Sequence, residues 1–205
     1  AVGLCAQFSS LMFAGYWGFV GGGMLFFSQY WGANDRGGIH HTYGVAASFS
    51  LVFSLLFAAV LRFFPHFCVG LFGPDPAVTE QAVEYVEILA FGIPFLMFSQ
   101  VTCAALRAVE KVNVPLISSF VSVAANTFFN FCLIGGHFGF PALGIRGAAI
   151  ATALGAVVQA IIVLLFFLFS ENPVRCSPGE MFRLPKGFLL KFFKTAAPVL
   201  LNEGM

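Results

Sequence analysis

Four polar side chains recur at four-residue intervals inside an uncharged stretch of the chain: Ser118, Ser122, Asn126 and Asn130. Four residues are slightly more than one helical turn, so in a helix these side chains would share one slanted stripe. An amide in apolar surroundings is costly unless it is hydrogen-bonded. Amide and hydroxyl groups can coordinate a hard cation through their oxygens or bind a carboxylate through their N–H groups. The stripe is therefore a candidate binding site.

Thr152 is a candidate partner for the two asparagines. One apolar segment ends near Gly135, and the next begins at Arg146. At about 1.5 Å of helical rise per residue, Asn130, Asn126 and Thr152 would lie about 7, 13 and 9 Å below the same membrane surface. The alternative is that these groups only join helices, since Asn, Ser and Thr commonly hydrogen-bond between membrane helices. Spacing alone leaves both interpretations open.

The composition indicates the class of protein in which these residues sit. The 205-residue chain is 59% hydrophobic and 9% charged, whereas soluble domains are about 25% charged. No Lys, Arg, Asp or Glu occurs in residues 37–61, 88–106, 112–145 or 147–170. About 20 apolar residues suffice for a helix to cross a bilayer, and these runs lack the alternation of a membrane β-barrel. We therefore predict an all-α, polytopic membrane protein.

Gly, Pro and charged residues divide these runs into expected membrane helices. Five are expected, at about 7–31, 43–62, 82–107, 114–135 and 146–170, with a loop over 63–78. Residues 171–195 are expected to form a cytoplasmic linker, and 196–205 the start of a further helix. Because the chain begins and stops within such patterns, we expect it to be a fragment of a longer protein.

The positive charges predict the orientation. The loops after the first, third and fifth expected helices hold eight Lys or Arg residues: Arg36, Arg107, Lys111, Arg175, Arg183, Lys186, Lys191 and Lys194. The loops after the second and fourth hold only Arg62 and Arg146. The positive-inside rule therefore assigns the first set to the cytoplasm. The net charge of +1 gives no indication of a nucleic-acid partner.

Motifs for enzymatic chemistry are absent from the sequence. It contains no GxSxG, HExxH or P-loop pattern, and no histidine pairs with an in-membrane acid at metal-ligand spacing. The five cysteines form no CxxC pair and are expected to be free thiols. We therefore expect neither an enzyme nor a bound cofactor. Glu203 is a further candidate, because an acid near the start of a membrane helix is either functional or part of an interface. Gln100 is a weaker one, since an isolated amide in a membrane helix more often bonds to a neighbouring helix.

Several motifs occur in the order typical of one transporter family. They are SQYWGANDRGG, LRAVEKVNVPL, NTFFN and FGFPALGIRGAAIATALGAVVQ, of which PALGIRGAAIAT is the most specific. On these motifs the chain resembles multidrug and toxic compound extrusion (MATE) transporters. The resemblance implies twelve helices in two lobes that export cationic or amphipathic compounds in exchange for Na⁺ or H⁺. The chain would supply helices two to six of the N-terminal lobe, the linker and the start of helix seven.

The resemblance also implies roles for particular residues. In several MATE proteins an acid on helix one, two polar residues on helix five and a Thr on helix six form a cation site. The matching positions here are Asn126, Asn130 and Thr152, which would hold Na⁺ or take part in H⁺ coupling. The helix-one acid lies outside the chain, and some relatives carry Asp where this chain has Asn130. Glu203 resembles an acid on helix seven of some members.

The expected partners are drug-like cations, the lipid bilayer and the C-terminal lobe of the same protein. The alternative function is flipping of a lipid-linked oligosaccharide by a related superfamily with a similar helical plan. Such a protein would be expected to place Arg or Lys in its cavity to bind phosphate groups. No Lys or Arg lies in the middle of an expected span, which favours multidrug export.

Overall fold

The computed structural model describes residues 20–21, 23–70, 76–170, 172–174 and 194 of the chain. Helices are the only regular elements in these ranges. The long ones are α2 (Arg36–Phe63), α4 (Pro76–Ala108), α5 (Asn113–Gly135) and α6 (Ile145–Phe169). The short ones are α3 (Pro65–Gly70) and the 3-10 turn η1 (His137–Gly139). Each long helix contains a segment long and apolar enough to cross a membrane, and the all-α membrane class is confirmed.

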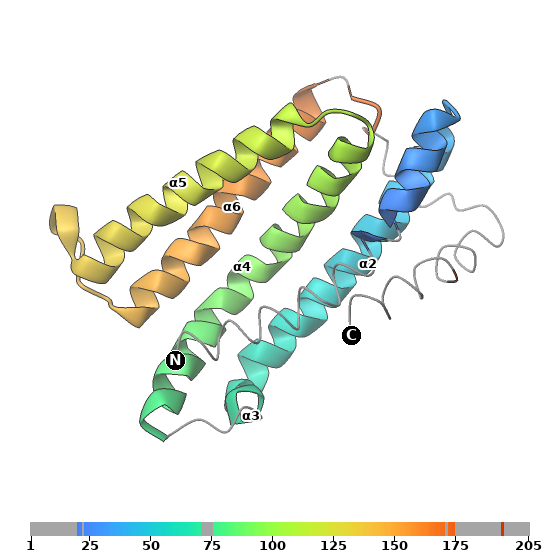
Figure 1. The fold of residues 1–205 in the computed structure, drawn as a ribbon. Helices are drawn as coiled ribbons and strands as arrows, with labels where there is room; N and C mark the ends of the chain where they lie inside the picture. The colour runs from blue at the N-terminus through green and yellow to red at the C-terminus, as the bar shows by residue number, and fades with distance from the viewer. Residues whose placement is uncertain (1–19, 22, 71–75, 171, 175–193, 195–205) are drawn as a thin grey trace.

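The long helices lie side by side in the order α5, α6, α4, α2 (Figure 1). α6 packs against both α5 and α4, and α4 packs against α2. α4 is the most buried of the four candidate spans in the described part of the chain. The polar stripe therefore lies on a helix at one edge of the row, facing α6.

Contacts at the two ends show that α2 runs antiparallel to α4, whereas α4 and α6 run in the same direction. At one end the Tyr43 hydroxyl lies 2.8 Å from Oγ1 of Thr102, and the Tyr43 ring stacks on Phe167. This is the start of α2 and the end of α4 and α6, and we call it the inner end. At the opposite end, the outer end, Arg62 of α2 bonds to Glu87 of α4. The charge bias of the sequence assigns the inner end to the cytoplasm.

α2 and α4 begin earlier than the sequence pattern predicts. α2 begins at Arg36 rather than near residue 43, because Asp35 Oδ1 accepts a hydrogen bond from the Gly38 N–H at 3.0 Å and caps the helix. The chain reverses within a short turn in which Asn34 has a φ of 56°. α4 begins at Pro76 rather than near residue 82. Proline suits a first helical turn, where its missing N–H would have no helical partner.

The remaining spans compare with the structure as follows. α5 and α6 begin and end within one residue of the expected 114–135 and 146–170. Gly136 ends α5 in a left-handed conformation with a φ of 71°, which glycine adopts without steric cost. The expected loop over 63–78 contains the helix α3. Most of the expected span 7–31 lies outside the described residues. In the part that the structure describes, residues 23–32 are helical.

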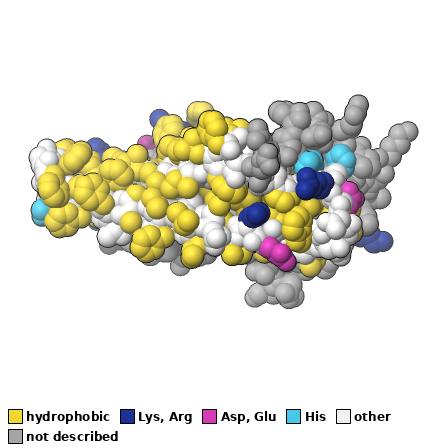
Figure 2. Space-filling view, turned by 90° about the horizontal axis from the view of Figure 1, so that it is seen from above, with side chains coloured by type: hydrophobic (Ala, Val, Ile, Leu, Met, Phe, Trp, Pro, Cys, Tyr) yellow, Lys and Arg dark blue, Asp and Glu magenta, His cyan; other side chains and the backbone are white. Residues whose placement is uncertain are grey.

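Apolar side chains cover much of the surface. Figure 2 shows a broad hydrophobic face with only scattered charged side chains. On α5 the residues opposite the polar stripe are exposed, including Phe120 at 75%, Phe128 and Phe131. An apolar surface of this extent would be unstable in water. It suits a helix row that faces lipid or further helices.

Candidate functional site

The polar stripe of α5 divides into two halves with different contacts. Ser118 is buried, and its hydroxyl donates to the backbone oxygen of Pro115 at 3.1 Å. The Ser122 hydroxyl donates to the backbone oxygen of Gly155 on α6 at 2.8 Å. Ser122 therefore makes the bond between helices that the alternative interpretation predicts, whereas the Ser118 bond lies within α5.

The two asparagines form a connected polar cluster with Thr152. The Asn130 side-chain N–H donates to Oδ1 of Asn126 at 3.0 Å, and the Asn126 N–H group donates to Oγ1 of Thr152 at 3.5 Å. The Thr152 hydroxyl donates to the backbone oxygen of Ala148 at 2.9 Å. All three side chains are half-buried. The structure thus brings together the three residues that the depth estimate grouped, and we call them the polar cluster.

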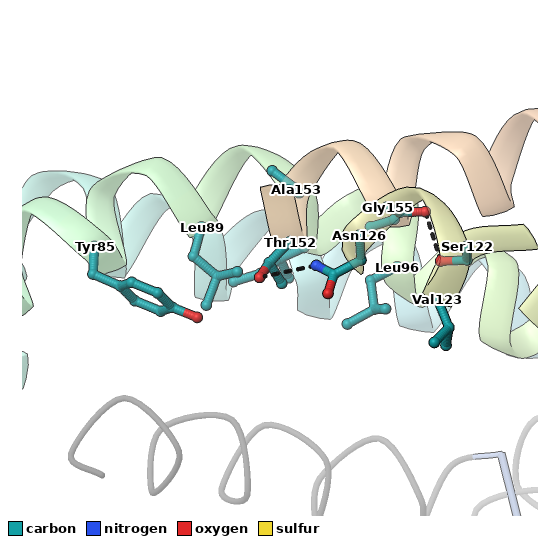
Figure 3. Close-up of a pocket in the computed structure, with 12 residues that line it drawn as sticks. Tyr85, Leu89, Leu96, Ser122, Val123, Asn126, Thr152, Ala153 and Gly155 are labelled. Carbon is teal, nitrogen blue, oxygen red and sulfur yellow. Dashed lines mark hydrogen bonds between the residues drawn. The ribbon is translucent and has the colours of Figure 1, made fainter. Parts of the chain in front are cut away.

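A cavity of about 330 Å³ lies beside the polar cluster, between α4, α5 and α6. Asn126 and Thr152 line it, and Figure 3 shows their side chains pointing toward each other across the boundary of α5 and α6. The wall from α4 is largely apolar. The full lining consists of Tyr85, Leu89, Gly92, Ile93, Leu96, Ser122, Val123, Asn126, Thr152, Ala153, Gly155 and Ala156. The cavity therefore presents a few polar atoms within an apolar enclosure, as small-ligand sites do.

Glycines allow the helices around the cavity to approach closely. A Cβ atom on Gly155 would lie 3.2 Å from Cβ of Asn126, closer than most real contacts of this kind. A Cβ atom on Gly92 of α4 would lie 2.9 Å from Cα of Ala153 on α6, which real structures essentially never show. The contact between Asn126 and Thr152 therefore depends on glycine at the helix crossing.

The polar cluster can offer oxygen ligands without a charge of its own. Asn and Thr side chains supply carbonyl and hydroxyl oxygens, and neither titrates near neutral pH. Hydrogen bonds within the cluster hold Asn126 between its two partners. The arrangement can thus accept a hard cation by exchanging internal hydrogen bonds for oxygen contacts, or remain as a structural network. Its role as a cation site is a prediction.

The other candidates lie apart from the cluster or outside the described residues. Gln100 is half-buried on α4 and is not among the residues that line the cavity. Glu203 lies outside the described residues.

The sequence reasoning missed two ion pairs at the outer end. In the structure Glu84 binds Arg146 of α6, and Glu87 binds Arg62 of α2. The sequence signal was available, because the two basic residues of the outer loops lie at helix ends near the same depth as these acids. The sequence did not show which helices pack against one another, so these pairs could not be assigned from it.

Comparison with known proteins places the chain among transporters. The family model MatE matches residues 1–132. The probable multidrug resistance protein YoeA of Bacillus subtilis (strain 168) is 22% identical over 187 residues, which is 90% of this chain and 40% of YoeA. The multidrug resistance protein MdtK of Yersinia pestis (strain Pestoides F) is 27% identical over 157 residues, covering 77% of this chain and 33% of MdtK. The chain spans less than half the length of these relatives.

Solved structures share the fold at low sequence identity. An inward-facing multidrug resistance MATE family transporter of the MOP superfamily superposes with a TM-score of 0.86 at 20% identity, covering 98% of this chain and 45% of that chain. An outward-facing structure of such a transporter gives a TM-score of 0.80 at 22% identity, covering 98% and 44%.

The four apolar helices among the described residues, together with the relatives, identify the chain as a multi-pass protein of the cell membrane. The family model matches well over half of its residues. The chain belongs to the MatE family of transporters.

Proposed function

We propose that the chain forms part of a secondary active multidrug efflux antiporter that exports cationic or amphipathic compounds in exchange for Na⁺ or H⁺. The observation that carries this proposal is the polar cluster of Asn126, Asn130 and Thr152 beside the cavity. The names of the relatives support the multidrug part of the proposal, since YoeA and MdtK are both described as multidrug resistance proteins.

The chemistry of the cluster favours direct contact with a cation. Its amide and hydroxyl oxygens suit a hard ion such as Na⁺. Coupling to H⁺ would require a titrating acid beyond these three residues. The cluster is half-buried, so an ion that enters loses much of its water and gains the oxygens in exchange.

Antiport follows if the cation and the exported compound favour different conformations. Each ligand then promotes release of the other through a coupling free energy between their sites. Such sites lie near the interfaces between helices that rearrange during transport. The cavity between α4, α5 and α6 supplies such a location within this part of the chain.

Flipping of a lipid-linked oligosaccharide is the alternative function. A pyrophosphate group would call for cationic side chains. Among the described residues that line the cavity, none is Lys or Arg. The cavity lining therefore favours multidrug export.

Substitution of both asparagines tests the proposal. The double variant Asn126→Ala/Asn130→Ala, in the full-length protein, is expected to lose the dependence of export on an imposed Na⁺ or H⁺ gradient. Since coupling between two ligands typically amounts to about 5- to 150-fold, the loss should be readily measurable as export of a fluorescent organic cation from vesicles.

Thr127→Ala is the matched control. Thr127 is exposed on the same helix, next to Asn126, and its hydroxyl donates to the backbone oxygen of Val123 within α5. This variant is expected to retain coupling. Wild-type coupling in the double asparagine variant would refute the site assignment, and equal loss in the control would indicate a general defect of α5.

A further inference from the structure

Two exposed ion pairs join α4 to its neighbours at the outer end. Nε of Arg146 donates to Oε2 of Glu84 at 2.7 Å, and the second amino group of Arg146 bonds the other carboxylate oxygen. This fork-like pairing joins α6 to α4. Arg62 lies 3.2 Å from Glu87 and joins α2 to α4. The two pairs are alike in residue type and exposure but connect α4 to different helices.

Of the two pairs, only Glu84–Arg146 joins two helices that both line the cavity, α4 and α6. Glu84 directly precedes Tyr85, the outermost cavity residue of α4, which Figure 3 shows at one end of the group. Arg146 precedes Thr152 by six residues, or about 9 Å along α6 at a rise of about 1.5 Å per residue. The pair thus bridges two of the three cavity walls, between the polar cluster and the outer end. α2, the partner in the second pair, does not line the cavity.

The exposure of the pair suits a contact that opens and closes. The Arg146 side chain is 57% exposed and that of Glu84 36%. Exposed ion pairs contribute little to stability because water and salt screen them, so separation of the two helices at this point is easily reversible. The bidentate geometry nevertheless defines one closed arrangement.

We propose that the Glu84–Arg146 ion pair is a latch at the outer end of the cavity between α4 and α6. A cation that approaches the polar cluster from the outside passes when the pair separates. That the passing ligand is a cation rests on the proposed function. The control of access to the cavity does not depend on it. Glu84 is left as a free carboxylate when the latch opens, which attracts a cation to the entrance.

Thiol labelling of the cavity tests the latch in the full-length protein. Leu89 lines the cavity on α4, one turn inward from Tyr85, and Leu89→Cys supplies the reporter. The probe is a membrane-impermeant, positively charged methanethiosulfonate added from the outside. The same protein without the reporter measures background labelling of the native cysteines.

Three versions of the pair keep the same net charge: the native pair, the double-neutral Glu84→Gln/Arg146→Gln, and the swapped Glu84→Arg/Arg146→Glu. The double-neutral protein is expected to label about threefold faster. An exposed ion pair is strong enough to change the fraction of open molecules by about this factor. The swapped protein should return toward the native rate. High salt should accelerate labelling of the native protein but not of the double-neutral protein.

The second ion pair provides the matched control. Arg62→Gln/Glu87→Gln removes a similar contact between α4 and α2 and is expected to leave labelling unchanged. Equal labelling in the native and double-neutral proteins would overturn the latch, as would equal acceleration in the control. Faster labelling without any change in the cation dependence of export would retain the latch and contradict the cation assignment of the cavity.

Discussion

Alanine at Gly155 and at Gly147 should separate the packing of α5 and α6 from the function of the polar cluster. Both glycines lie on the face of α6 that contacts α5. A Cβ atom on Gly147 would lie 2.6 Å from the backbone oxygen of Leu133, which cannot move freely because it accepts a hydrogen bond from the Leu143 N–H at 2.8 Å. The corresponding contacts at Gly155 are 3.2 and 3.3 Å, so a shift of a few tenths of an ångström relieves them.

These distances set the expected magnitudes. Overpacking costs about 1–3 kcal/mol, and replacing Gly by Ala within a helix returns about 1 kcal/mol. For Gly155→Ala the overpacking cost lies near the bottom of this range, so the gain in helix propensity offsets it and stability should be nearly unchanged. For Gly147→Ala the overpacking cost lies near the top of this range. After the gain in helix propensity is subtracted, the variant should lose about 2 kcal/mol of unfolding free energy. The thermal unfolding midpoint of the full-length protein in detergent micelles should therefore fall for Gly147→Ala and not for Gly155→Ala.

The apparent affinity for the coupling ion should instead change more in Gly155→Ala than in Gly147→Ala. The bond from Asn126 to Thr152 is already 3.5 Å long, and moving the helices apart at Gly155 would break it. A hydrogen bond between membrane helices contributes about 0.6 kcal/mol, so its loss should weaken the apparent affinity for the coupling ion by about threefold. The assay is export of a fluorescent cation as a function of Na⁺ concentration or of pH.

Two outcomes would refute this reasoning. If Gly155→Ala lowers the unfolding midpoint as much as Gly147→Ala, the contact distances do not govern the packing. If both variants change the apparent ion affinity equally, the effect is not local to the polar cluster.

Two further predictions concern the ends of the helix row. Asp35→Ala should destabilise the protein by about 1 kcal/mol by removing the cap of α2, whereas Asp35→Asn should retain most of the stability; equal unfolding midpoints for the two variants would contradict the capping role. In α3, outside the four candidate spans, burial raises the pKa of the Cys68 thiol. Less thiolate is then present at any given pH, so maleimide labelling of Cys68 should rise with pH later than that of free cysteine, and a rise at the same or lower pH would contradict it.

The sequence by itself determined where α5 and α6 begin and end. Both helices are bounded by local signals, namely the glycines after Leu133 and the positive charge at Arg146, and both matched expectation within one residue. The four-residue spacing of the stripe, together with the short hairpin, also placed Asn126, Asn130 and Thr152 at similar depth. These features depend on helical rise and hydropathy, which act over short distances along the chain.

Only the tertiary structure decided how the stripe is used. Ser118 bonds within α5, Ser122 bonds to the backbone of α6, and Asn126 bonds to Thr152 beside the cavity. The third wall of that cavity comes from α4, and the Glu84–Arg146 pair joins residues 62 positions apart in the chain. Which helices become neighbours depends on close steric fit, such as that between Gly92 and Ala153. Steric fit between distant segments leaves no periodic pattern in either segment alone, so the spacing that revealed the stripe could not reveal the cavity beside it.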